Sequence, residues 1–252
     1  MRMPMFKKIG IKNIYLIPFI FTFANALFGF LSVIKALDDQ YVAAAVCILL
    51  AALMDLIDGR LARFLGSCSS IGKELDSLCD AISFCCAPAI LIYSWSLYQL
   101  PTMGPVVLGL YVCAGLLRLA RFNVNITGSK QVFTGLATTM AAFFIATCVL
   151  YSSTLVMAFG VAMVRPERIA GIVTAIALLM VSAIKFPSFK IIRLDFITLS
   201  SVLICVGVFS ILIIQKFPLL LACSMAYIIG GFCWGVAHEL LLKISGFIKN
   251  RL

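Results

Sequence analysis

Long apolar runs dominate the chain, and short polar segments separate them. Most runs are about 20 residues long, the length that an α-helix needs to cross the hydrocarbon core of a bilayer. Basic, glycine or proline residues mark the breaks, a pattern that favours membrane helices over a membrane β-barrel. We predict eight spans, at about residues 14–37, 41–65, 71–100, 104–123, 133–153, 169–186, 196–214 and 218–242.

The composition supports an all-α integral membrane protein. Hydrophobic residues make up 63% of the 252 residues and charged residues only 12%, and a soluble fold could not bury that much apolar surface. The net charge of +10 is spread in small groups between the apolar runs, which argues against a nucleic-acid binder. The ten cysteines are scattered without a CxxC pair, so we interpret them as small apolar side chains.

The distribution of basic residues predicts the orientation in the membrane. If the N-terminus lies inside and the eight spans alternate in direction, only Lys35, Arg165, Arg168 and Lys216 of the 20 basic residues fall outside. Short cytoplasmic loops carry an excess of lysine and arginine. We therefore expect both termini on the cytoplasmic side.

Acidic residues gather in one segment of this apolar chain. Five of the ten lie between Met54 and Asp80, and ionisable residues within membrane spans are costly and mark candidate functional sites. Asp55 and Asp58 are three residues apart near the end of the second predicted span. Asp76 and Asp80 are four apart near the start of the third. Each spacing puts a pair on one helix face, and the antiparallel spans should bring both pairs to a similar depth near the cytoplasmic surface.

Four carboxylates in one place require compensating positive charge. One or two hard divalent cations with oxygen ligands would supply it. Small neighbours such as Gly59 leave room for a ligand, and Arg63 offers a bidentate contact to phosphate. The segment therefore predicts a site for a metal-bound diphosphate. The alternative interpretation is a set of carboxylates that pack helices together and pair with nearby basic side chains.

The segment also resembles a known signature. It contains D-x2-D-G-x2-A-R-x8-G-x3-D-x3-D, in which the fixed positions are Asp55, Asp58, Gly59, Ala62, Arg63, Gly72, Asp76 and Asp80. This pattern resembles that of the CDP-alcohol phosphotransferase family. The resemblance implies an enzyme that cleaves the CMP–phosphate bond of a CDP-linked lipid and passes the phosphatidyl group to an alcohol. It also implies a core of six membrane helices and a homodimer.

Further segments resemble the phosphatidylserine synthase branch of that family. They are residues 17–25 with Gly29, 117–123, 133–136, and 179–182 with 186–190. This resemblance implies CDP-diacylglycerol and L-serine as substrates. It implies that Asp55, Asp58 and Asp76 bind Mg²⁺ or Mn²⁺, which bridges the diphosphate. Asp80 would act as general base on the serine hydroxyl, or as a further metal ligand.

The remaining candidates concern substrate binding. Small residues that would let cytidine and ribose approach the backbone are Gly59, Ala62 and Gly72. Arg118 and Arg121 share a helix face and are either a pocket for the lipid phosphate or serine carboxylate, or ordinary loop charge. Asn25 either faces the nucleotide or bonds across helices, and Lys130 is a weaker candidate.

These expectations divide the chain into three parts. Residues 1–13 form a basic amphipathic interfacial segment, residues 14–193 a six-helix catalytic membrane domain, and residues 194–252 two further helices with a basic cytoplasmic tail. We expect a multi-pass protein in the plasma or inner membrane of a prokaryote, with its active site on the cytoplasmic side and no nucleic-acid partner.

Two alternatives stay open. The first is another enzyme of the same family, such as a phosphatidylglycerophosphate, phosphatidylinositol-phosphate or phosphatidylcholine synthase. The second is a divalent-cation transporter that uses the four carboxylates. A transporter is expected to have broken helices near the middle of the bilayer, whereas these acids lie toward one side and no second half carries a matching pair.

Overall fold

The computed structural model describes residues 17–65, 70–125, 135–160, 164–184, 220–233 and 235. All regular elements within these ranges are helical, which confirms the all-α class. They are α1 Ile17–Leu37, α2 Tyr41–Leu65, α3 Ser70–Asp80, a π-helical segment Ala81–Cys86, α4 Ala87–Trp95, a 3₁₀ turn Leu97–Gln99, α5 Met103–Asn125, α6 Thr138–Leu150, α7 Ser152–Phe159 and α8 Pro166–Val181. A further apolar helix covers Leu220–Cys233.

Four helical segments are long and apolar enough to cross a membrane. They are Phe19–Leu37, Tyr41–Leu61, Ile71–Trp95 and Met103–Val124, and they correspond to the first four predicted spans. The chain therefore has the helices of an integral membrane protein. The predicted span 196–214 and the segment 1–13 lie outside the described residues, so the count of eight spans and the three-part division stay predictions.

The predicted fifth span differs from the observed structure. Instead of one helix over 133–153, α6 begins at Thr138 and a separate helix α7 follows it. Gly135 has a φ of 81° and donates its N–H to the carbonyl of Ile184, and residues 135–137, the described ones directly before α6, are not helical. Tyr151 leaves the helical conformation, with φ −102° and ψ 19°, and divides the two helices. The sixth predicted span corresponds to α8, which begins three residues earlier than expected, at Pro166.

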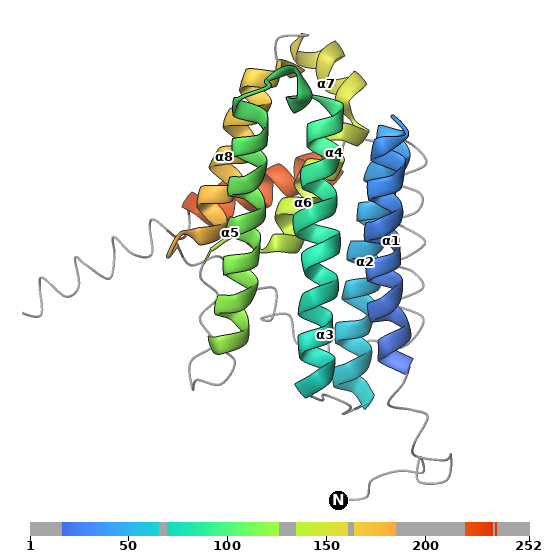
Figure 1. Ribbon diagram of the computed structural model, residues 1–252. Coiled ribbons are helices and arrows are strands. Elements are labelled where there is room, and N and C mark those ends of the chain that lie inside the picture. Colours follow the sequence, from blue (N-terminus) through green and yellow to red (C-terminus); the bar gives the residue numbers. More distant parts are fainter. Residues whose placement is uncertain are drawn as a thin grey trace, which may run out of the picture.

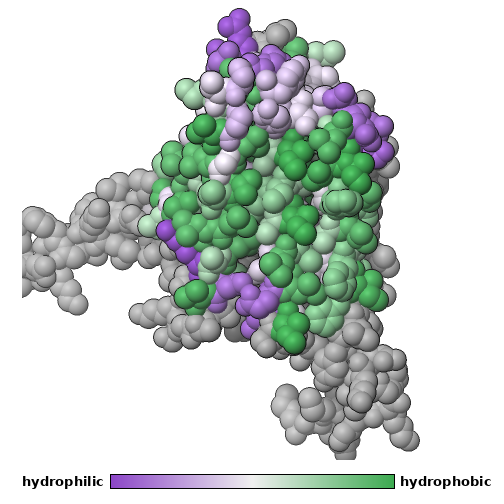
Figure 2. All heavy atoms as spheres, viewed as in Figure 1, coloured by the Kyte–Doolittle hydropathy of each residue, from purple (hydrophilic) through white to green (hydrophobic). Residues whose placement is uncertain are grey.

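The helices form a bundle in which α1 and α2 run side by side (Figure 1). Next to them α3, the π segment and α4 continue as one rod, and α5 packs against α8. Figure 2 shows a largely hydrophobic face between hydrophilic residues that gather toward the two ends of the molecule. Large buried side chains such as Phe84, Tyr111, Ile145 and Met180 fill the interior.

The π-helical segment begins directly after Asp80. Two hydrogen bonds connect it to two other helices, α5 and α1. The Tyr111 hydroxyl of α5 donates to the carbonyl of Phe84 at 3.0 Å, and the Ser83 hydroxyl donates to the carbonyl of Asn25 in α1 at 2.9 Å. Such segments are rare and frequently occur at functional sites. The rod is therefore fixed next to the aspartates.

Helix α1 approaches this segment closely at Gly29. A Cβ atom at position 29 would lie 2.3 Å from the Ser83 Oγ and 2.7 Å from the Ser83 Cα. Because one of these atoms belongs to the backbone, a side chain could not be accommodated by a rotamer change alone. The contact between α1 and the π segment therefore requires glycine.

Replacing Gly29 with alanine tests this packing. We expect Gly29→Ala to lower the free energy of unfolding by about 1–3 kcal/mol, as overpacking in a tight core does. The matched control is Gly109→Ala in α5, where an added Cβ meets no atom within 4 Å and alanine should stabilise the helix by about 0.5–1 kcal/mol. Thermal unfolding in detergent measures both, and equal melting temperatures for the two variants would contradict the packing.

Candidate active site

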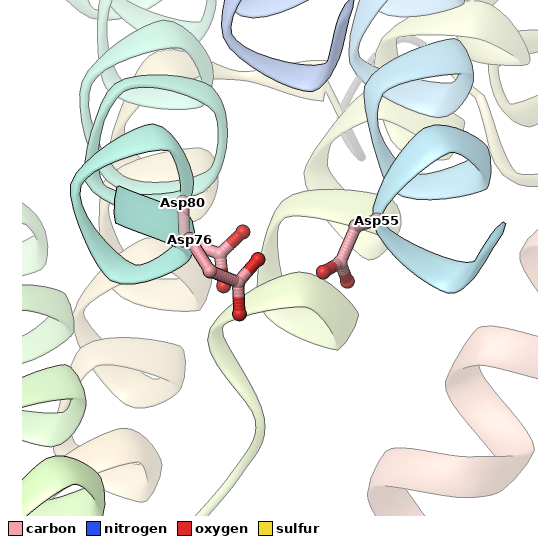
Figure 3. Close-up of side chains that lie close together, drawn as sticks. All are labelled: Asp55, Asp76 and Asp80. Atoms are coloured by element: carbon pink, nitrogen blue, oxygen red, sulfur yellow. The ribbon is translucent and has the colours of Figure 1, made fainter. Parts of the chain in front are cut away.

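Three of the four predicted aspartates converge. One carboxylate oxygen from each of Asp55, Asp76 and Asp80 lies within 4.8 Å of the other two. Figure 3 shows Asp55 on α2 pointing toward Asp76 and Asp80, which project from neighbouring turns of α3. The predicted antiparallel arrangement of the second and third spans thus brings carboxylates from two helices into one group. We call Asp55, Asp76 and Asp80 the carboxylate cluster.

Asp58 lies outside the carboxylate cluster but is buried beside α1. Its side chain is only 4% exposed, and the Thr22 side chain of α1 hydrogen-bonds to it. Its second oxygen, Oδ2, is buried without a hydrogen-bond partner in the described part of the chain. The fourth aspartate therefore keeps an oxygen that the described protein groups leave unsatisfied.

The donor set of this region fits a divalent cation. Besides Asp58 Oδ2, Asp76 Oδ1 is buried and has no hydrogen-bond partner among the described residues. Buried polar atoms are almost always hydrogen-bonded or bound to an ion, and carboxylate oxygens are the ligands that Mg²⁺ and similar hard cations prefer. The carboxylate cluster can hold a metal ion, which would offset the repulsion between its three acidic groups.

Asn25 contacts this cluster from α1. Its side chain is fully buried, and its Nδ2 donates to Asp80 Oδ1 at 3.1 Å. Asn25 therefore bonds across helices, and its contact with the nucleotide stays a prediction. A second such bond lies close to Asp76, where the Ser77 hydroxyl donates to Asn123 Oδ1 of α5 at 3.1 Å.

The two arginines of α5 have different surroundings. Arg118 is partly buried, and its Nη1 donates to Thr138 Oγ1 at 3.0 Å. Its Nε is buried without a hydrogen-bond partner among the described groups. Arg121 is exposed and donates from Nη1 to the carbonyl of Val181 at 2.9 Å. Because Val181 is the last residue of α8, Arg121 binds a helix C-terminus, where positive charge is favourable.

The other predicted substrate-binding residues are less fully described. Gly59 is exposed, and a Cβ built there would meet no atom within 4 Å. Gly72 lies on α3 and is half-buried. Ala62 and Arg63 belong to α2, but their side chains lie outside the described part, as does the whole of Lys130.

Sequence reasoning missed three polar residues that support the site. Thr22 hydrogen-bonds to Asp58. Ser77 hydrogen-bonds to Asn123, and Thr138 accepts a hydrogen bond from Arg118. Each is a hydroxyl within or beside an apolar run. That signal marks a position where a partner is needed, but it does not identify the partner, which comes from another helix.

The chain belongs to the CDP-alcohol phosphatidyltransferase family. Residues 15–183 match the model of that family, a match that covers all of α1 through α8. This confirms the family inferred from the aspartate signature. The chain is accordingly a transferase, which argues against the alternative of a cation transporter.

Similar proteins from bacteria and an archaeon carry related names. The CDP-diacylglycerol–serine O-phosphatidyltransferase of Helicobacter pylori strain J99 is 33% identical over 182 residues, which cover 71% of this chain and 75% of that protein. The Bacillus subtilis strain 168 protein of the same name is 32% identical over 174 residues, 69% of this chain and 91% of its own. The archaetidylserine synthase of Methanothermobacter thermautotrophicus is 38% identical over 184 residues, 70% and 72% of the two chains. These relatives confirm the resemblance to the phosphatidylserine synthase branch.

Proposed function

We propose that this protein transfers the phosphatidyl group of CDP-diacylglycerol to L-serine, giving phosphatidylserine and CMP. The observation that carries the proposal is the convergence of Asp55, Asp76 and Asp80 from two helices within a chain of this family. The names of the similar proteins support serine as the acceptor, because all three name a serine product or a serine acceptor.

We assign Asp55, Asp58 and Asp76 to the binding of Mg²⁺ or Mn²⁺, with Asp80 as a further ligand. The unsatisfied oxygens of Asp58 and Asp76 support this assignment. When bound, the cation would polarise the phosphoryl oxygens and neutralise charge on the departing CMP. The four aspartates would hold the cation at one place, so that the diphosphate of the substrate binds there in a single orientation.

Asp80 is the proposed general base. A free hydroxyl is a poor nucleophile, and a positioned carboxylate that takes its proton is the usual remedy. The proton of the serine hydroxyl passes to the Asp80 carboxylate while the serine oxygen forms a bond to the phosphatidyl phosphorus. The bond between that phosphorus and the CMP oxygen breaks, and CMP leaves with its electron pair. The hydrogen bond from Asn25 supports this role because it holds the carboxylate in place.

Arg118 is the proposed contact for the serine carboxylate. Its guanidinium is held by Thr138 and keeps a buried Nε without a described partner, so it has capacity for another acceptor. A guanidinium matches the geometry of a carboxylate better than any other side chain. Arg121, which already binds the end of α8, is a weaker candidate for this contact.

The nucleotide end of the substrate would lie beside Gly59, Ala62 and Gly72. The open space around Gly59 supports this placement. Because CDP-diacylglycerol has its acyl chains in the leaflet and its nucleotide in water, the reaction must take place near the membrane surface. We place that surface on the cytoplasmic side of a prokaryotic plasma or inner membrane, and we expect a homodimer as the family resemblance implies.

An acceptor assay tests the proposed reaction. Purified protein in mixed micelles with Mn²⁺ should release CMP from CDP-diacylglycerol in a serine-dependent way. Glycerol 3-phosphate, inositol phosphate and choline should each support less than about a tenth of that rate, because a site built to bind one polar group rejects acceptors that lack it. Release that depends equally on one of these other alcohols would assign the chain to another branch of the family.

Substitution of Arg118 tests the acceptor contact. Arg118→Gln keeps a polar side chain but loses the charged fork that contacts Thr138. Because a hydrogen bond to a charged group contributes about 1.5–3 kcal/mol, the KM for serine should rise at least about tenfold, with little change in the KM for CDP-diacylglycerol. The matched control is Arg168→Gln, an exposed arginine of α8. An unchanged KM for serine in Arg118→Gln would remove Arg118 from the acceptor site.

A further inference from the structure

The buried face of α1 carries polar and small residues where an apolar face would suffice for packing. They recur at spacings of three and four residues, which places them on one side of the helix: Thr22, Asn25, Gly29 and Ser32. Thr22 is 5% exposed, and Asn25 and Ser32 are fully buried. We call these four residues the polar stripe of α1.

The polar stripe contacts an aspartate on each of the two acid-bearing helices. Thr22 hydrogen-bonds to Asp58 of α2, and Asn25 donates to Asp80 of α3 at 3.1 Å. Helix α1 thus contributes no acidic group of its own, but it holds one carboxylate from each side of the site.

Asn25 is bound through both its side chain and its backbone. While its Nδ2 donates to Asp80, its backbone carbonyl accepts a hydrogen bond from Ser83 Oγ at 2.9 Å. Asp80 and Ser83 lie on either side of the start of the π segment. The close approach at Gly29, one turn further along α1, packs against the same Ser83. The amide of Asn25 is therefore held at a fixed position relative to the Asp80 backbone.

The hydrogen bonding of Asn25 is one-sided. Its Oδ1 is buried and has no partner within the described ranges, although buried polar atoms are normally paired. An apolar side chain of similar volume would avoid that unsatisfied acceptor. An ionised carboxylate accepts hydrogen bonds but does not donate them. The amide of Asn25 supplies the N–H donor that Asp80 needs, which an apolar side chain could not do.

We propose that Asn25 is a positioning residue that acts through Asp80. Its N–H restricts rotation of the Asp80 carboxylate and so keeps that group directed toward Asp55 and Asp76. Without the donor, the carboxylate would sample other rotations, and both its place in the carboxylate cluster and its readiness to take a proton would suffer. Removing partners of this kind typically costs about 10–100-fold in metal affinity or activity. The proposal rests on the proposed function only where turnover is the readout.

The test compares Asn25→Leu with Ser32→Ala. Leucine removes the donor and keeps the branched shape of the side chain. Ser32 lies on the same buried stripe, and its Oγ has no described hydrogen-bond partner, so its replacement should leave the aspartates undisturbed. We expect Asn25→Leu to weaken Mn²⁺ binding about tenfold, measured by electron paramagnetic resonance of the free ion without substrate. In the CMP-release assay, kcat should fall about 10–100-fold with little change in either KM. Ser32→Ala should match the wild type in both.

A double-mutant cycle with Asp80→Ala separates positioning from a general structural role. If Asn25 acts through Asp80, adding Asn25→Leu to Asp80→Ala should cost no further Mn²⁺ affinity, because coupled residues are not additive. An equal loss in both backgrounds would overturn the proposal, as would unchanged Mn²⁺ affinity and kcat in the single variant. If leucine lowers the melting temperature strongly, Asn25→Ala provides the same comparison. If the wild type did not use serine, the proposed acceptor would be refuted. The double-mutant cycle measured by Mn²⁺ affinity would still decide the role of Asn25.

Discussion

Mutual repulsion among half-buried carboxylates is the constraint on which this structure depends. One carboxylate oxygen from each of Asp55, Asp76 and Asp80 lies within 4.8 Å of the other two, in helices that are otherwise apolar enough to cross a membrane. Bringing like charges together away from water is costly, and a bound cation or substrate group would offset that cost. A protein that maintains such a cluster needs helices held firmly enough to resist separation.

The surrounding scaffold supplies that resistance. The absence of a side chain at Gly29 lets α1 approach the π segment, and hydrogen bonds from Ser83 and Tyr111 attach the same segment to α1 and to the interior. The polar contacts of α1 then reach Asp58 and Asp80 directly. Close packing in the apolar part of the bundle and hydrogen bonding at the acidic end thus serve one purpose, which is to keep α2 and α3 at a fixed separation.

The sequence predicted the features that depend on local pattern. The limits of α2, Tyr41–Leu65, agree with the second predicted span because hydropathy and the flanking polar residues define them. The convergence of Asp55 with Asp76 followed from helical spacing and antiparallel spans. Both inferences need only the geometry of a single helix and of its connection to the next.

Features that depend on contacts between distant segments could not be predicted in this way. The π segment after Asp80 is maintained by Ser83 and Tyr111 through partners on other helices, and nothing in its own residues distinguishes it from an α-helix. Arg118 and Arg121 share a helix face, yet one binds Thr138 and the other the end of α8. The first predicted span placed Asn25 on a membrane helix, but its bond to Asp80 depends on how α3 packs against α1.

Anomalous diffraction from crystals grown with Mn²⁺ and CDP-diacylglycerol is the most direct measurement of the central claim. That claim is that the carboxylate cluster exists to bind a cation together with the diphosphate of the lipid substrate. The account predicts a manganese peak in contact with carboxylate oxygens of the cluster and with the diphosphate of the substrate. A bound CDP-lipid whose diphosphate lies away from these aspartates, or a manganese peak that none of them contacts, would contradict it.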